Sequence, residues 1–124
     1  MVVKDLTDAR PFVAGDGSLL REILHPDHDP VDLGFSLAHA TVEPGRKTVP
    51  HRLACAEVYY VSAGEGIMHV GPESARVRPG QAVHIPAGAV QWIESVGPGD
   101  LVFLCIVAPP WTPDCEEALR ERVR

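Results

Sequence analysis

The chain has 124 residues, the size of one domain, and 45% of them are hydrophobic, which is enough for a buried core. Seventeen acidic residues against eleven basic ones give a formal net charge of −6, the wrong sign for a surface that neutralises nucleic-acid phosphates. No apolar run approaches the roughly 18 residues of a membrane span, and residues 1–10 contain no signal-peptide pattern. We therefore expect no nucleic-acid or membrane partner. Three cysteines without a pairing pattern favour a cytoplasmic location.

The first 34 residues give the weakest structural signals. We predict a strand over 19–24 and a loop over 25–30, where the sequence reads His-Pro-Asp-His-Asp-Pro. His25 and His28 stand among aspartates there, but the two prolines and the turn-forming residues explain this composition better than a metal cluster does.

Apolar runs of four to eight residues, separated by glycine and proline, follow from residue 35 onward. Turn signals every 8 to 12 residues or so favour a β-sandwich or barrel over repeated βαβ units. Leu101–Val107 is apolar at every position, as in a strand buried on both faces or inside a closed barrel. The predicted strands are 35–42, 57–62, 66–70, 75–78, 82–86, 90–96 and 101–108.

The C-terminal segment carries helix signals instead. Thr112 suits an N-cap, and Pro113 suits the first helical position. Acidic residues follow directly and arginines come later, in the order that a helix dipole favours. We predict a short C-terminal helix over about 113–122.

Alternate positions between residues 51 and 61 combine polar and apolar side chains. A strand through this segment points every second side chain to one face. A second alternating segment begins at Gln91, after a turn at 86–88 that brings it beside the first. The first segment's shared face consists of His51, Leu53, Cys55, Glu57, Tyr59 and Val61.

The spacing of this segment resembles the first cupin motif, which is Gly, five residues, His-x-His, three or four residues, Glu, six residues, Gly. The chain supplies Gly45, His51, Leu53, Glu57 and Gly64 at these positions. Leucine therefore stands where the family has its second histidine.

The second cupin motif is Gly, five residues, Pro-x-Gly, two residues, His, three residues, Asn. Here it is matched by Gly80, Pro86, Gly88, Gln91 and Ser95. Over both motifs seven of the ten positions agree, and the whole chain resembles the small one-domain cupins. The resemblance implies a single all-β domain over 1–124, a cupin double-stranded β-helix with its motif core at 45–95. It also points to a homodimer, which would cover exposed strand edges.

In cupins with the full motifs, the histidines and the glutamate resemble a four-donor metal cage. Leu53 and Gln91 replace two of the imidazoles here. The resemblance leaves a divalent metal site of His51, Glu57 and Gln91, weaker than the full cage because a glutamine carbonyl is a poor donor and leucine is none.

Each candidate residue also has an alternative role. Glu57 is a metal ligand, a catalytic general base or a partner of His51, and it needs some partner if it is buried. Gln91 binds metal or hydrogen-bonds to a ligand or to Glu57. Tyr59 shares the interior face and lines the pocket or packs in the core. His84, two residues before Pro86, is a reserve ligand.

Two functional hypotheses follow. In the first, the protein is a metal-dependent enzyme of isomerase or dioxygenase type, with Glu57 or a bound water moving a proton. In the second, the metal cage has decayed, and His51, Glu57, Tyr59 and Gln91 bind a small molecule by hydrogen bonds. The sequence does not choose between them.

Overall fold

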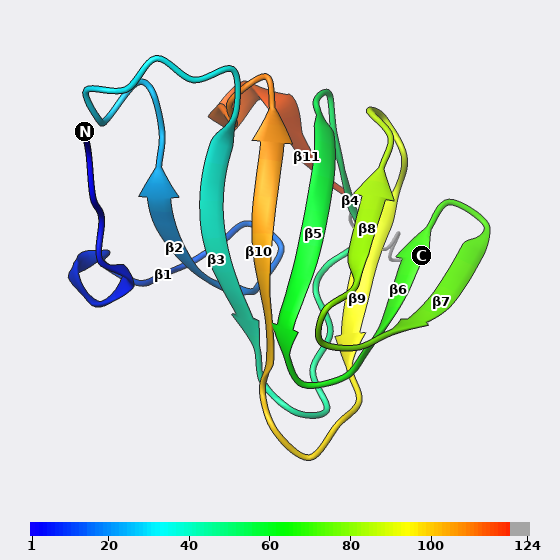
Figure 1. Cartoon of the computed structure of the whole chain (residues 1–124). Helices are drawn as coiled ribbons and strands as arrows, with labels where there is room; N and C mark the ends of the chain where they lie inside the picture. Colours follow the sequence, from blue (N-terminus) through cyan, green and yellow to red (C-terminus); the bar gives the residue numbers. More distant parts are fainter. Residues whose placement is uncertain (120–124) are drawn as a thin grey trace.

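Two antiparallel β-sheets pack face to face in the computed structural model, which describes residues 1–119 (Figure 1). The first sheet has the strand order β1-β2-β3-β10-β5-β8, and the second has the order β11-β4-β9-β6-β7. The architecture confirms the predicted all-β barrel. In chain order the elements are η1 (Leu6–Asp8), β1 (Phe12–Val13), β2 (Leu19–Leu24), β3 (Ser36–Val42), β4 (His51–Leu53), β5 (Ala56–Ala63), β6 (Gly66–Val70), β7 (Glu73–Val77), β8 (Ala82–Ile85), β9 (Gln91–Ser95), β10 (Leu101–Ala108), η2 (Pro113–Cys115) and β11 (Glu116–Ala118).

All seven strands predicted between residues 35 and 108 form, with ends that differ by two residues or fewer, and the strand predicted over 19–24 is β2. The alternation over residues 51–61 does not belong to a single strand. The chain forms β4 in one sheet, crosses at Ala54 and Cys55, and continues as β5 in the other sheet. Alternate side chains remain buried throughout, because the interior of the barrel lies inside both sheets.

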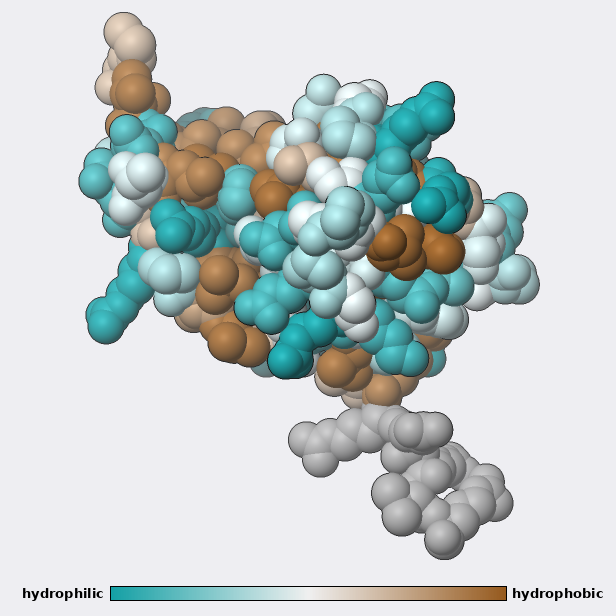
Figure 2. Space-filling view, turned by 90° about the horizontal axis from the view of Figure 1, so that it is seen from below, coloured by the Kyte–Doolittle hydropathy of each residue, from teal (hydrophilic) through white to brown (hydrophobic). Residues whose placement is uncertain are grey.

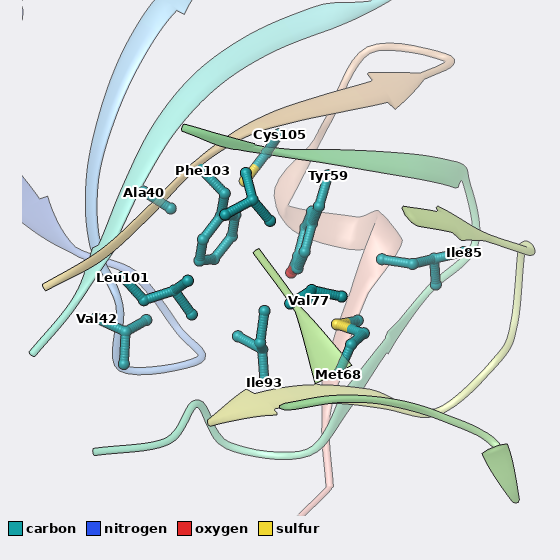
Figure 3. Close-up of a cluster of buried hydrophobic side chains, with 11 residues drawn as sticks. Ala40, Val42, Tyr59, Met68, Val77, Ile85, Ile93, Leu101, Phe103 and Cys105 are labelled. Carbon is teal, nitrogen blue, oxygen red and sulfur yellow. The ribbon is translucent and has the colours of Figure 1, made fainter. Parts of the chain in front are cut away.

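The core lies between the two sheets, where Figure 3 shows side chains from both converging. Phe103 of β10 packs against the ring of Tyr59 of β5, with 4.4 Å between ring centroids. Ile93 of β9 closes the core from the opposite sheet and is fully buried. Burying side chains of this size contributes about 1.5–3 kcal/mol each to stability.

Strand β10 departs from its prediction on one face. Leu101, Phe103, Cys105 and Val107 are buried, but the residues between them are only half-buried. The strand lies between β3 and β5 in the middle of its sheet, so its outer face is covered by neighbouring side chains and not by a second layer.

The predicted C-terminal helix was wrong over the residues described. Pro113–Cys115 form one 3-10 turn with Thr112 at its N-cap position, and the chain then becomes extended as β11. Strand β11 pairs with β4, with Glu116 opposite Leu53. Pairing with an open sheet edge outweighs the local helix signals. Residues 120–122 of the predicted helix lie outside the described residues.

Hydrophobic surface on the face shown in Figure 2 gathers on the side that carries β1 to β3. Phe12, Val13 and Leu19 are among its exposed side chains at the edge of the first sheet. The homodimer expected from such an edge remains a prediction.

Within residues 1–119, no helix is long and apolar enough to cross a membrane.

Candidate functional site

A cavity of about 160 Å³ lies inside the barrel between the two sheets. Its walls are largely apolar, with Leu20, Leu37 and Val107 among them. We call it the barrel pocket. Its polar lining includes Asp16, His25, His51, Glu57, Tyr59 and Glu116.

The pairing of the two motif segments is fixed by a backbone hydrogen bond. Gly88, at a φ of 81°, donates its N–H to the carbonyl oxygen of Leu53 at 2.7 Å. A positive φ of this kind favours glycine, which explains the residue in the turn. The bond sets the register in which His51 of β4 lies opposite Gln91 of β9.

Gln91 joins the two sheets through its side-chain amide. Its Oε1 accepts a hydrogen bond from the Tyr59 hydroxyl at 3.0 Å, and its Nε2 donates to Oε1 of Glu57 at 3.0 Å. All three side chains are at least 94% buried. Gln91 does not itself line the barrel pocket. It positions Glu57 and Tyr59, which do line it, through these two hydrogen bonds.

The Glu57 carboxyl group is buried in the largely apolar barrel. Burial raises its pKa from 4.5 to about 8, partly opposed by the hydrogen bond from Gln91. The carboxylates of Asp16 and Glu116 add a smaller upward shift. Glu57 is therefore mostly protonated at pH 7. Its Oε1 is held by Gln91, and within residues 1–119 its Oε2 makes no hydrogen bond.

His51 is buried and held in one tautomer. Its Nδ1 lies 2.8 Å from the carbonyl oxygen of Val49, which can only accept, so Nδ1 carries the proton. In the neutral ring the lone pair is then on Nε2. This atom is 3.8 Å from Oδ2 of Asp16, too far for a hydrogen bond, and it makes none to another residue in the range 1–119.

Asp16 is a site residue that the sequence analysis missed. Its Oδ1 accepts hydrogen bonds from the N–H and the hydroxyl of Ser18, at 2.9 and 2.6 Å. Its carbonyl oxygen accepts from the N–H of Val49 at 2.7 Å. The Asp-Gly-Ser turn is a visible local signal, but nothing in the sequence shows that this turn docks beside His51.

Glu116 and His25 were missed as well. Oε1 of Glu116 accepts from Trp111 Nε1 at 3.2 Å, and β11 carries the residue to the pocket. His25 accepts from the N–H of Asp27 on Nδ1 and donates from Nε2 to the carbonyl oxygen of Trp111 at 2.6 Å. Both contacts tie the C-terminal segment to the pocket.

The motif residues do not fit the predicted metal cage. Gln91 uses both ends of its amide on Tyr59 and Glu57, and Leu53 packs in a second apolar cluster with Cys55 and other residues. In the part of the chain that the structure describes, no three His, Cys, Asp or Glu side chains are grouped so that they could hold a metal ion.

His28, His69 and His84 are not among the residues that line the barrel pocket. His84 is exposed on β8 and lines a separate groove, so it does not join His51. His69 stacks on Trp92, and its Nε2 lies 2.6 Å from a carboxylate oxygen of Glu94. His28 pairs with Glu22 at 2.6 Å, and this contact raises the pKa of His28.

Comparison with known proteins gives a match to the Cupin domain over residues 38–107. The chain is also 35% identical over 113 residues to the uncharacterized protein MJ1618 of Methanocaldococcus jannaschii, an alignment that covers 89% of this chain and 88% of that protein.

Two solved structures share the fold at low sequence identity. The polyketide cyclase RemF of Streptomyces resistomycificus has a TM-score of 0.80 and 21% identity, with 98% of this chain and 87% of that chain covered. A predicted oxalate decarboxylase of Thermotoga maritima has a TM-score of 0.73 and 22% identity, covering 87% and 99% respectively. At these identities the likeness extends to the fold alone.

Proposed function

The chain belongs to the cupin family, and we propose that its barrel pocket binds a small, largely apolar molecule and moves a proton at that molecule's polar end. The observation that carries this proposal is that the buried Glu57 carboxyl, whose pKa is raised to about 8, and His51 Nε2, which makes no hydrogen bond within residues 1–119, line one pocket. The two groups supply an acid and a base in the same site.

Glu57 is the proton donor of this proposal. A carboxyl group with a pKa of about 8 holds its proton at neutral pH yet releases it readily to a ligand atom. Gln91 fixes one carboxyl oxygen, so the proton is directed to the other. Tyr59 supports Gln91 from behind, and its hydroxyl stays neutral because burial raises the Tyr59 pKa.

His51 is the proton acceptor. The carbonyl oxygen of Val49 fixes the ring through Nδ1–H, so Nε2 is the atom that takes up a proton, and Asp16 lies close enough to stabilise the charge that forms when it does. The other walls are largely apolar, and a less polar surrounding strengthens both interactions.

Binding in the pocket is tested by ligand-observed NMR with a library of small fragments. We expect the fragments that bind to compete for one site, and we expect Glu57→Ala and His51→Ala to weaken them at least tenfold. His84→Ala is the matched control, because His84 is an exposed histidine on a different groove. Fragments that bind equally well to all four proteins would contradict the proposal.

The second candidate is a binding protein without catalysis, which the apolar walls favour as much as they favour an enzyme. Hydrogen–deuterium exchange of the bound fragments in D₂O separates the two. Exchange at a carbon beside the polar end, lost in Glu57→Gln, supports the enzyme. Binding without exchange supports the carrier.

Divalent metal binding, the finer expectation from the family motifs, is tested by restoring the missing donors. In Leu53→His/Gln91→His two imidazoles join His51 and Glu57, so Zn²⁺ should bind at least tenfold more tightly than to the wild type. Isothermal titration calorimetry measures this affinity, after circular dichroism shows that the variant folds. Equal affinities would show that the missing imidazoles do not account for the mismatch with the cage.

A further inference from the structure

We propose that the ligand of the barrel pocket carries a positively charged nitrogen, as an amine on a small apolar or aromatic body. This inference rests on the proposed function, since it assigns a ligand class to the same pocket. It excludes carboxylates and phosphates as ligands.

Acidic side chains outnumber basic ones in the pocket lining, and Glu57 is the one acid among them that is mostly protonated at pH 7. Four acidic side chains are among the lining residues, and within residues 1–119 no lysine or arginine is. The arginines next to pocket residues in the sequence turn elsewhere: Arg21 donates to the carbonyl oxygen of Leu6, and Arg52 pairs with Glu117 outside the pocket. The acidic lining residues are Asp16, Glu22, Glu57 and Glu116.

Most of these carboxyl groups keep an oxygen free of protein donors. Asp16 is held through Oδ1 by Ser18, and Glu116 through Oε1 by Trp111. Oε2 of Glu116 lies 2.7 Å from where a Cβ would stand on Gly15, so this carboxylate oxygen lies against the backbone of Gly15 at the pocket wall. An anion entering here meets uncompensated negative charge in a poorly solvated space, whereas an ammonium group meets acceptors.

His51 supplies an independent acceptor. Its side chain is 3% exposed, and Nε2 points its lone pair at the pocket with no hydrogen-bond partner in residues 1–119. The 3.8 Å between Nε2 and Oδ2 of Asp16 is too long for a direct bond. One N–H-bearing nitrogen at about 2.9 Å from each atom bridges them with two of its donors.

Aromatic side chains complete the fit. Phe12, Tyr59 and Trp111 all line the pocket, and aromatic faces attract organic cations as well as apolar groups. A cavity of about 150 Å³ accepts a benzene-sized molecule. Benzylamine, protonated at pH 7, therefore matches the pocket in size, charge and aromatic character.

The test is isothermal titration calorimetry with benzylamine, benzyl alcohol and benzoate, which share one ring and differ in the charge of the side group. We expect benzylamine to bind at least tenfold more tightly than benzyl alcohol and benzoate to give no binding. Asp16→Asn and Glu116→Gln should each reduce that preference at least threefold. Glu117→Gln removes the neighbouring charge outside the pocket and should leave the preference unchanged.

The possible failures are distinguishable. If benzyl alcohol or benzoate binds as tightly as benzylamine, the amine proposal is overturned while the pocket of the proposed function stands. If the Glu117→Gln control lowers the preference as much as Glu116→Gln does, general surface charge and not the pocket explains the selectivity. If benzylamine does not bind, the amine proposal is overturned, and the fragment library decides separately whether the pocket binds anything.

Discussion

Replacing Glu57 with glutamine should make the protein several kcal/mol more stable than the wild type at pH 9, and should leave the two nearly equal at pH 4. Burial raises the pKa of Glu57 from 4.5 to about 8, so the folded state holds a proton that the unfolded state releases. The free energy of unfolding of the wild type therefore falls as the pH rises from about 4.5 to about 8, by about 1.4 kcal/mol per unit of pKa difference.

Glutamine removes this dependence because it is neutral at every pH and matches the protonated carboxyl in shape. Its Oε1 still accepts from Gln91. Urea denaturation at pH 4, 6, 8 and 9 measures the difference, with Glu73→Gln as the control, since Glu73 is exposed on β7. Parallel stability curves for wild type and Glu57→Gln would show that Glu57 is already ionised near pH 5 in the folded protein.

The same variant should lose proton transfer at the pocket. A glutamine amide does not give up its proton, so stability and function change in opposite directions. If Glu57 were needed for folding, Glu57→Gln would lower the stability and the proton transfer together.

Gly64→Ala should destabilise the barrel by about 3 kcal/mol or more. Gly64 has a φ of 77° in the turn between β5 and β6, and a Cβ there would lie 2.3 Å from the carbonyl oxygen of Asp100 and 2.8 Å from Cα of Leu101. A left-handed backbone costs an L-residue about 1–2 kcal/mol, and the clash with backbone atoms adds an overpacking cost of about 1–3 kcal/mol.

Gly71→Ala is the matched control for this prediction. Gly71 also has a positive φ, of 55°, but no heavy atom lies within 4 Å of the Cβ position. We expect a loss of only about 1 kcal/mol there. Thermal and urea denaturation of the two variants separate the cost of conformation from the cost of contact. Equal losses would show that the turn moves to accept the methyl group at Gly64.

The strands between residues 35 and 108 were predictable because the alternation of buried side chains and the glycine–proline turns are local signals. The crossing from β4 to β5 was not, because the burial pattern continues unbroken through Ala54 and Cys55 while the chain changes sheet. The C-terminal helix failed for a different reason. Thr112 begins a single 3-10 turn, and the chain then pairs with the open edge of β4 as strand β11.

The polar centre of the site, formed by His51, Glu57 and Gln91, was predictable from the motif spacing. His51 lies opposite Gln91, and the Gln91 side chain hydrogen-bonds to Glu57. The spacing did not reveal that the side-chain amide of Gln91 would hydrogen-bond to both Tyr59 and Glu57. Asp16 and Glu116 lie far from both motifs in the sequence, and only the tertiary fold brings them to the pocket. No local pattern distinguishes them from other acidic residues on the surface.

The pocket is assembled from segments inside and outside the part of the chain that matches the family model. His51, Glu57 and Tyr59 fall within residues 38–107, the portion that matches the family, whereas the segments 12–16 and 111–116 lie outside it. Mutations in these flanking segments alter the walls at β1 and β11, the outermost strands of the two sheets, and leave the central strands unchanged. We therefore expect substitutions in these segments to change the ligand preference while His51, Glu57 and Tyr59 keep their places. Grafting both segments onto the barrel of a relative should carry the preference with them.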